Sequence, residues 1–391
     1  MVSFEGLRAG GSSRFRIHAR ARSKLGMYWA QFGAYHADRC AAVAAELDSH
    51  YDVVGMETAS TSFTYGWERP SLDSKYKLLT IKQNDVAEAV SLRSELVGLL
   101  RLILREKINV MFFAGYERPA VFLAAICCRL VAIKPYLFLD SKFDDKPRTI
   151  FLEFFKSLLL LPYCGALVSG PSAASYLRFL GFRARPIALG YDTVSVERMR
   201  RLADGEANTL YDARTFLVVA RLVPKKNIET ILSAYAAYRE GGGGNRKLVI
   251  CGSGPLEAKL RDKVFALGID RFVEFRGFCS QEQVASAMLT ALVLLLPSTE
   301  EQWGLVVNEA LAFGLPIIIS SSAGAGEVLV KAFINGYRLD PRDVEQWSSA
   351  MLEMDKDEKR WVSFANGSRA LAKQGDVSVF VGGMKTLLAK R

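Results

Sequence analysis

The chain has 391 residues, of which 50% are hydrophobic and 24% are charged. This composition is that of a folded globular protein and excludes a disordered or low-complexity chain, while the length predicts two domains. The formal net charge is +10, and +8 of it lies in residues 1–200, which hold 27 Lys and Arg against 19 Asp and Glu.

The first 22 residues are basic but lack the apolar core of a secretory signal, so we expect a flexible extension there. Short β-branched and aromatic runs then alternate with helical periodicity, which predicts a parallel sheet covered by helices. The expected strands are 25–32, 51–56, 108–115, 135–140 and 165–170, with helices at 37–47, 119–132 and 172–181.

The most apolar segment, TIFLEFFKSLLLLPYCGALV, is interrupted by Glu153, Lys156 and Pro162. No stretch of the sequence reaches the roughly 18 consecutive apolar residues of a spanning helix. We expect a buried helix followed by a strand in this segment, and an amphipathic surface that touches lipid is the alternative.

A polar stretch at 199–214 predicts a domain boundary, after which the alternation restarts. Strands are expected at 215–222, 247–254, 272–278, 291–298 and 316–320. The predicted fold is therefore α/β, with two Rossmann-like domains whose parallel sheets face a central cleft. The predicted parts are an extension at 1–22, domains at 23–205 and 206–372, and a last helix at 373–391 that packs back on the N-terminal domain.

The basic half is compatible with an anionic membrane or a phosphorylated substrate, and a generally basic surface is an equally open alternative. No zinc-finger spacing or RNA-binding aromatic signature accompanies the charge, so nucleic acid is not an expected partner. The six cysteines form no CxxC pair and the three histidines are scattered. We expect a reduced, cytoplasmic protein with no disulfide framework and no metal site.

The segment PSTEEQWGLVVNEALAFGLPIII contains Glu301 and Glu309, separated by seven residues. A helix is expected to begin near Gly304, where glycine permits close backbone approach to a ligand. The N–H groups of Leu305 and Val306 would then point toward an anion. Two carboxylates placed in this way suit the vicinal hydroxyls of a sugar and of a ribose.

With its flanking residues, this segment resembles the signature of the retaining GT-B glycosyltransferases of family 4, the glycosyl transferases group 1. Four further segments match motifs of that family in the same order. They are ARLVPKKNIETILSAY (220–235), LVICGSGPLEAKL (248–260), FVEFRGF (272–278) and SAGAGEVLVKAFINGYRLDP (322–341).

The resemblance implies that Arg221 and Lys226 clamp the diphosphate of a nucleotide-sugar donor and that Glu301 acts beside them in catalysis. Two cations and helix N-terminal amides can stabilise the charge of the leaving diphosphate, so metal-independent chemistry without a cofactor is expected. The implied donor-binding residues are Glu309, Trp303, Gly304, Leu305, Val306, Gly252, Gly254, Arg276, Gly277 and Phe278.

The N-terminal half offers three cleft candidates. His36 opens the first helix, where a contact with acceptor or donor and a plain capping role are equally open. Many family members carry a histidine after the strand that ends near residue 139, but this chain has Asp140 and Lys142 there. These two residues are expected either to line the cleft or only to order the surface.

The expected function is that of a retaining, hexosyltransferase-type enzyme acting on a nucleoside diphosphate sugar. The acceptor is expected to be a hydroxyl of a glycan or lipid-linked molecule in surface polysaccharide or lipopolysaccharide assembly, with peripheral contact to the inner face of the cytoplasmic membrane. A non-catalytic nucleotide-sugar binding protein and another GT-B activity, such as an epimerase, are the alternatives. A dinucleotide site is disfavoured because GSGPLE lacks the third glycine of G-x-G-x-x-G.

Overall fold

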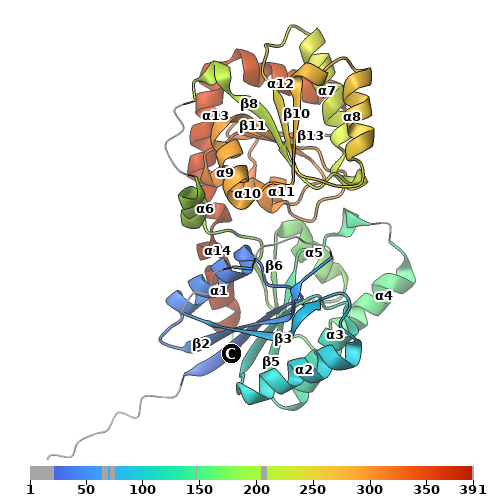
Figure 1. The fold of residues 1–391 in the computed structure, drawn as a ribbon. Helices are drawn as coiled ribbons and strands as arrows, with labels where there is room; N and C mark the ends of the chain where they lie inside the picture. Colours follow the sequence, from blue (N-terminus) through green and yellow to red (C-terminus); the bar gives the residue numbers. More distant parts are fainter. Residues whose placement is uncertain (1–21, 64–68, 71–74, 147, 204–208, 390–391) are drawn as a thin grey trace, which may run out of the picture.

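The computed structural model describes residues 22–63, 69–70, 75–146, 148–203 and 209–389. Two sheets, each with its own helices, form two domains that lie one above the other in Figure 1. Apart from Arg22, the predicted N-terminal extension lies outside the described residues.

The N-terminal domain is built on a parallel sheet. Its strands are β1 (Ser23–Trp29), β2 (Tyr51–Thr61), β3 (Lys77–Val86), β4 (Val110–Ala114), β5 (Lys134–Leu139), β6 (Ala166–Val168) and β7 (Ile187–Leu189). Among the described residues they form one seven-stranded sheet with the order β3-β2-β1-β4-β5-β6-β7. All of the paired strands are parallel, so their carboxyl ends share one edge.

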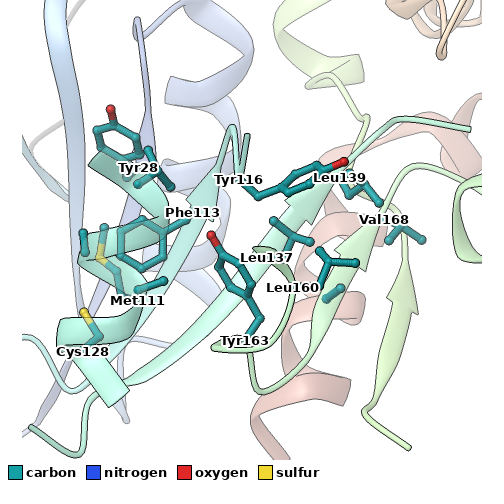
Figure 2. Close-up of a cluster of buried hydrophobic side chains, with 14 of the residues drawn as sticks. Tyr28, Met111, Phe113, Tyr116, Cys128, Leu137, Leu139, Leu160, Tyr163 and Val168 are labelled. Atoms are coloured by element: carbon teal, nitrogen blue, oxygen red, sulfur yellow. The ribbon is translucent and has the colours of Figure 1, made fainter. Parts of the chain in front are cut away.

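Helices cover both faces of this sheet, as a parallel sheet requires. They are α1 (Ala34–Glu46), α2 (Leu92–Arg105), α3 (Pro119–Leu130), α4 (Ile150–Leu159) and α5 (Pro171–Phe179), with α6 (Val196–Leu202) following toward the second domain. Residues of α2, α3 and α5 form one core with the sheet, and Figure 2 shows Met111, Phe113 and Leu137 in it. Residues of α1 cover the other face.

The C-terminal domain repeats the architecture. Its strands are β8 (Thr215–Val219), β9 (Leu248–Cys251), β10 (Val273–Gly277), β11 (Ala291–Leu296), β12 (Ile317–Ser320) and β13 (Gly336–Leu339). In the part of the chain that the structure describes, they form a six-stranded parallel sheet ordered β10-β9-β8-β11-β12-β13. The order reverses between β8 and β11, which is where ligands bind in open α/β sheets.

The helices of this domain form two layers. They are α7 (Ile228–Glu240), α8 (Glu257–Ala266), α9 (Gln281–Thr290), α10 (Leu305–Ala312), α11 (Ala325–Leu329), α12 (Val344–Lys356) and α13 (Glu358–Leu371). Residues of α7, α8 and α12 share one core, and residues of α9, α10 and α11 share the other.

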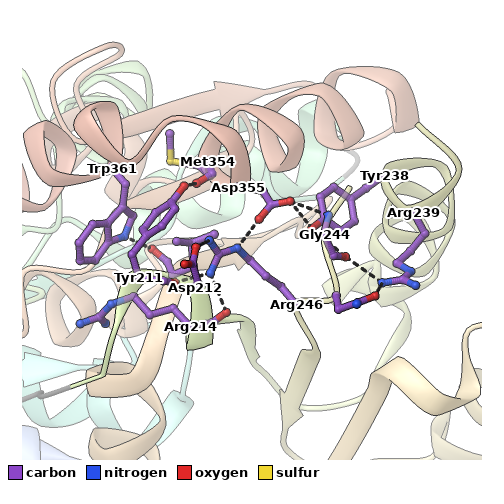
Figure 3. A network of polar contacts seen from close by, with 12 residues as sticks. Tyr211, Asp212, Arg214, Tyr238, Arg239, Gly244, Arg246, Met354, Asp355 and Trp361 are labelled. Atoms are coloured by element: carbon purple, nitrogen blue, oxygen red, sulfur yellow. Dashed lines mark hydrogen bonds and ion pairs between the residues drawn. The ribbon is translucent and has the colours of Figure 1, made fainter. Parts of the chain in front are cut away.

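A partly buried polar cluster holds the segment before β9 against α7 and α12 (Figure 3). Asp355 of α12 is ion-paired with Arg246 and accepts hydrogen bonds from the Tyr238 hydroxyl and the Gly244 N–H, each at 2.7 Å. Burial acts to raise the pKa of Asp355, but these donors outweigh it and the pKa is lowered. The glycine run at 241–244 therefore has a packing role in this domain.

The last helix crosses between the domains. Helix α14 (Val377–Ala389) contacts α1, β6 and β7, so a C-terminal segment completes the N-terminal core. In Figure 1 it lies within the lower domain, beside α1.

The sequence-based fold class is confirmed, but three edge strands were not predicted and the burial predicted for helix α4 is wrong. The edge strands β3, β7 and β13 were not predicted, because β3 is largely polar and the other two are short and only partly buried. The equally short strands β6 and β12 are fully buried and apolar, and they were predicted. The expectation that α4 is a buried helix is wrong, since most of its apolar side chains are exposed. No helix among the described residues has both the length and the apolar character needed to cross a bilayer.

Candidate functional site

Three loops meet at the carboxyl edge of the second sheet, after β8, β9 and β10. Gly252 has φ +140°, and a Cβ at this position would lie 1.9 Å from the carbonyl oxygen of Ala220. A Cβ at Gly254 would lie 2.5 Å from the oxygen of Leu222. Both glycines thus permit the close loop contact that fixes the backbone around Arg221.

Backbone hydrogen bonds tie these loops together. The Leu222 N–H donates to the Ser253 oxygen at 2.9 Å, and the Gly252 N–H donates to the Gly277 oxygen at 2.7 Å. The predicted residues Gly252, Gly254 and Gly277 therefore shape the loops through their backbones. Arg276 is exposed and its guanidinium pairs with Glu274 at 2.7 Å.

The E-x7-E segment connects β11 to α10. Gly304 has φ +103° and is the N-cap of α10, so the helix begins at Leu305 as the sequence predicted. A Cβ on Gly304 would lie 3.4 Å from Cγ of Glu301, so the first glutamate lies against the helix start. Glu309 is the fifth residue of the helix and is buried.

Lys226 and Glu301 form an ion pair. Lys226 ends the short 3-10 helix Pro224–Lys226, and Asn227 follows with φ +54°. The Asn227 amide donates to the Pro297 oxygen at 3.1 Å, which holds this turn against the end of β11. The Ser298 hydroxyl donates to Glu301 at 3.0 Å, so the Glu301 carboxylate is oriented by two groups.

Glu309 is bonded to the other domain. The Tyr35 hydroxyl, at the start of α1, donates to Oε1 of Glu309. Burial raises the pKa of Glu309, and the Tyr35 hydrogen bond and the charge of Arg198 oppose this rise only in part. Burial, followed by the Glu309 charge, raises the pKa of Tyr35.

A second interdomain link lies beside the first. The Arg198 guanidinium on α6 pairs with Asp38 of α1 at 2.8 Å and donates to the side chain of Gln281 in α9 at 2.8 Å. Burial raises the pKa of Asp38, although Arg198 acts to lower it. Together these contacts bring α1, α6 and α9 to one place.

A cavity of about 840 Å³ lies at this junction. Residues of both domains line it, including Tyr35 and Asp38 from the first and Val219 and Cys251 from the second. The predicted site residues that line it are Arg221, Gly252, Phe278 and Glu309. The cavity therefore combines an arginine, an exposed aromatic ring and a buried carboxylate.

Two of the predicted site residues are engaged in local packing. His36 is buried, accepts a hydrogen bond from the Gly33 N–H at 3.0 Å and stacks on Trp29, with ring centroids 4.6 Å apart. Burial, and then Arg39, hold the pKa of His36 well below its ordinary value, so the ring is a neutral cap. Lys142 is buried and pairs with Asp144 at 2.8 Å, which orders the loop after β5. This geometry favours the capping and ordering roles of the two residues.

Trp303 lies between the two domains. Its indole N–H donates to Asn308 at 2.9 Å, and its ring lies 2.9 Å from the position of a Cβ on Gly170. Asn308 in turn donates to the Asp192 oxygen at 3.1 Å. The Trp303 side chain therefore packs the domains together instead of lining the cavity.

Two carboxyl groups lie near each other at the cleft edge of the first sheet. Asp140 follows β5 and Asp192 follows β7. Burial, and then the charge of Asp192, raise the pKa of Asp140. Burial raises the pKa of Asp192, although Arg39, whose guanidinium lies 3.3 Å from it, acts to lower it. The charge of Glu301 also acts to raise the pKa of Asp192, so the pair of carboxyl groups borders the E-x7-E segment.

No cluster of three or more His, Cys, Asp or Glu side chains within the described residues is arranged to hold a metal ion. The six cysteines are all free. Cys251 and Cys279 both line the cavity.

The sequence did not predict the residues that the first domain and α6 contribute to the lining of the cavity. Tyr35 and Asp38 have the i,i+3 spacing of one helix face, a signal that was present in the segment AYHADRCAA. Arg198 lies in the crossover between the domains, where the sequence analysis singled out no residue. Asp192 follows a strand of three residues that the sequence did not predict.

Comparison with known proteins identifies the family of the second domain. The family model described as glycosyl transferases group 1 matches residues 204–371. The GDP-mannose-dependent alpha-(1-6)-phosphatidylinositol dimannoside mannosyltransferase of Mycobacterium tuberculosis is 34% identical over 145 residues, which are 37% of each chain. The matches to the first curated relatives span only about a third of their length, 33% and 37%.

Solved structures match nearly the whole chain. Sucrose-phosphate synthase of Thermosynechococcus elongatus has a TM-score of 0.73 at 16% identity, covering 94% of this chain and 99% of its own. HepE of Anabaena, solved in complex with UDP, has a TM-score of 0.70 at 13% identity, covering 94% and 100%. At such identities the likeness establishes the fold alone. The domain at residues 204–371 therefore belongs to the glycosyl transferases group 1 family, on a chain with the two-domain GT-B fold.

Proposed function

We propose that this chain is a retaining glycosyltransferase that moves a hexosyl group from a nucleoside diphosphate sugar to a hydroxyl group. The observation that carries the proposal is the cavity between the domains, where Arg221, Phe278 and buried Glu309 line one space. An arginine suits a diphosphate, an aromatic ring suits a nucleobase and a carboxylate suits a diol. The family of the second domain and the UDP bound to the structurally similar HepE support the same proposal.

In this proposal Arg221 and Lys226 neutralise the diphosphate as it leaves. Lys226 now pairs with Glu301, and a bound donor diphosphate would compete for its ammonium group. The N-terminal amides of α10 add a positive dipole at the same edge of the sheet. Such preorganised charge acts most strongly on the transition state, because negative charge on the diphosphate grows as the bond to the sugar breaks.

The reaction that we propose needs no separate base. The acceptor oxygen attacks the anomeric carbon from the face that the diphosphate leaves, and the leaving phosphate oxygen takes the acceptor proton. Glu309 binds the ribose hydroxyls and Glu301 binds the sugar hydroxyls. We propose that the two cations replace a divalent metal, so that donor turnover persists in EDTA.

The proposed acceptor is a glycan or a lipid-linked molecule in surface polysaccharide or lipopolysaccharide assembly, used on the cytoplasmic side of the membrane. The basic charge of residues 1–200 supports an anionic acceptor or membrane. The name of the Mycobacterium tuberculosis relative supports a lipid-linked acceptor, since that protein acts on a phosphatidylinositol mannoside.

Donor binding in EDTA tests the proposal. We would titrate UDP-, GDP- and ADP-sugars into the full chain and measure affinity by calorimetry and release of nucleoside diphosphate. Glu309→Gln is expected to weaken the preferred donor by about 10- to 100-fold, because hydrogen bonds to a charged carboxylate are lost. Glu301→Gln is expected to lower kcat more than donor affinity.

Glu300→Gln is the matched control, because Glu300 is the exposed neighbour of Glu301. It should change neither affinity nor turnover. If no donor binds, or if Glu309→Gln binds as wild type does, the donor site is assigned wrongly. Tight binding without turnover on any acceptor or by hydrolysis would indicate a nucleotide-sugar binding protein.

A further inference from the structure

Helix α4 exposes its apolar side chains to solvent. Of its ten residues only Glu153 is buried, whereas Ile150 is 87% exposed and Phe151 is 80% exposed. In an ordinary surface helix of a globular protein the apolar stripe faces the core and the charged residues face water. Helix α4 has the opposite orientation.

A polar anchor holds the helix in this orientation. The Glu153 carboxylate pairs with Lys156 at 2.9 Å and with Arg148 at 3.4 Å, and it accepts a hydrogen bond from the Tyr176 hydroxyl of α5. Burial acts against its charge, but Tyr176 and Lys156 outweigh burial and lower the pKa of Glu153. The buried Glu153 carboxylate is thus paired with three groups. These contacts fix the orientation of α4 and so keep its apolar face outward.

The exposed apolar surface extends beyond the helix. Phe143 precedes α4 and lies edge-on to Phe179 of α5, with ring centroids 5.4 Å apart. We call the whole surface the α4 patch. Its residues are Phe143, Ile150, Phe151, Leu152, Phe154, Phe155, Leu158, Leu161 and Phe179, all of them exposed. So many exposed apolar side chains gathered on one helix and its neighbours mark an interaction surface.

Basic residues flank the α4 patch along the chain. Lys146 precedes α4, Arg178 adjoins Phe179 and Arg183 follows α5, and all three are exposed, whereas the acidic Glu153 is buried beneath α4. Asp144 is exposed but is paired with Lys142. An apolar face rich in Phe and Leu with a basic margin is the pattern of a helix that lies in the interfacial layer of an anionic membrane.

We propose that the α4 patch inserts into the surface of an anionic lipid bilayer. Figure 1 shows α4 at the outer edge of the N-terminal domain, where a bilayer can reach it without contacting the second sheet. The loop between β5 and α4 contacts the second domain, since Gln302 donates a hydrogen bond to the Ser141 hydroxyl at 3.3 Å. Docking through α4 therefore places this interdomain contact on the side of the molecule that faces the lipid headgroups.

The docking itself does not depend on catalysis. Only its use, to present a lipid-linked acceptor at the cleft, rests on the proposed function. A protein that binds bilayers but transfers no sugar would keep the docking surface and lose the proposed activity. A protein that binds donor but no bilayer would keep the proposed donor site and lose the docking surface.

Co-sedimentation with vesicles tests the docking. The full chain is mixed with vesicles of phosphatidylcholine alone or of phosphatidylcholine with phosphatidylglycerol, at low and high salt. Wild type is expected to pellet with the anionic vesicles and to be released in part by salt. The double variant Phe151→Ser and Phe155→Ser should lower the bound-to-free ratio about tenfold or more, because two exposed rings no longer insert.

Phe265→Ser is the matched control, since Phe265 is 79% exposed on α8 in the other domain. It should bind vesicles as wild type does. Donor affinity of the double variant, measured without vesicles, should equal that of wild type and report intact folding. The proposal is overturned if wild type ignores anionic vesicles, or if the double variant binds them equally well. It is also overturned if light scattering shows a wild-type dimer that the double variant converts to a monomer, because the patch would then join two copies.

Discussion

Tyr35 and Glu309 form the most informative side-chain pair of the cavity. The Tyr35 hydroxyl occupies Oε1 of Glu309, and the two side chains come from different domains. A ribose diol would need the same carboxylate lone pairs. In the proposed function Tyr35 is therefore a competitor that a donor must displace from Glu309.

Tyr35→Phe keeps the ring and removes this competitor. We expect the donor dissociation constant to fall about two- to tenfold, the range given by one net hydrogen bond. Calorimetric titration with the preferred nucleotide sugar measures it. Tyr211→Phe is the control, because its hydroxyl bonds the Met354 oxygen remote from the cavity. Weaker donor binding in Tyr35→Phe would mean that the hydroxyl orients Glu309 instead of competing for it.

Asp140 makes stability depend on pH. Its pKa is raised in the fold, first by burial and then by Asp192, so the fold favours the protonated acid. The stabilisation is complete below the unfolded pKa near 3.8 and is lost as pH rises through the folded pKa. Asp140→Asn stays neutral at every pH and removes this loss.

The free energy of unfolding of Asp140→Asn, relative to wild type, should therefore increase as pH rises from about 4 toward 8. Urea denaturation at a series of pH values measures the difference. Asp262→Asn changes an exposed aspartate on α8 and serves as the control. A difference that stays constant or shrinks with rising pH would show that Asp140 is not a raised carboxyl group.

At this scale the sequence supplied only part of the site. Arg221, Lys226, Glu301 and Glu309 lie in one domain, in segments whose residue types and order are informative locally. The partner of Glu309, Tyr35, lies 274 positions away in the sequence. Such a contact depends on how two domains meet, and no local spacing encodes it.

At the scale of elements, the loops that follow β8 and β9 depend on their glycines. Gly252→Ala would place a Cβ 1.9 Å from the Ala220 oxygen, and the backbone at φ +140° disfavours any side chain. We expect this change to cost about 3 kcal/mol or more of stability and to disrupt the backbone around Arg221. Urea denaturation and donor titration measure the two effects.

Gly268→Ala is a suitable comparison, because Gly268 also has a positive φ, +65°, but no atom lies within 4 Å of its Cβ position. It should cost only about 1–2 kcal/mol and leave donor binding unchanged. Equal costs for the two variants would mean that the loop moves to accept a methyl group at position 252.

Elements were predictable where burial gives a simple pattern. The strand β11 is buried at every residue and its sequence ALVLLL is apolar throughout, so its assignment was direct. The edge strand β3, KLLTIKQNDV, is mostly polar and was missed. Helix α4 was predicted to be buried because apolar residues usually are. In the structure the ion-paired Glu153 faces inward, and the apolar side chains of the helix are therefore exposed.

At the scale of the whole molecule, the chain returns to its first domain. Helix α14 follows the second domain but inserts Phe380, Met384 and Leu387, all fully buried, into the N-terminal core. The sequence predicted a last helix that packs back on the N-terminal domain, and α14 contacts α1 and β7, whereas the individual contacts depend on how the domains are arranged. This return couples the stability of the first domain to a segment that follows the second domain in the sequence.

Phe380→Ala tests that coupling. Phe380 is fully buried, and its ring lies 5.5 Å from that of Phe138 in β5 and 6.5 Å from that of Tyr191. Truncation should cost about 3–5 kcal/mol, because the cavity that it leaves is lined by rings that cannot collapse freely. Hydrogen exchange should show loss of protection in β4 and β5, although the mutation lies in the last helix. Phe333→Ala removes an exposed ring of the second domain and should change neither strand. If protection is lost only in α14, the helix detaches by itself, and the first sheet is stable without the segment that covers it.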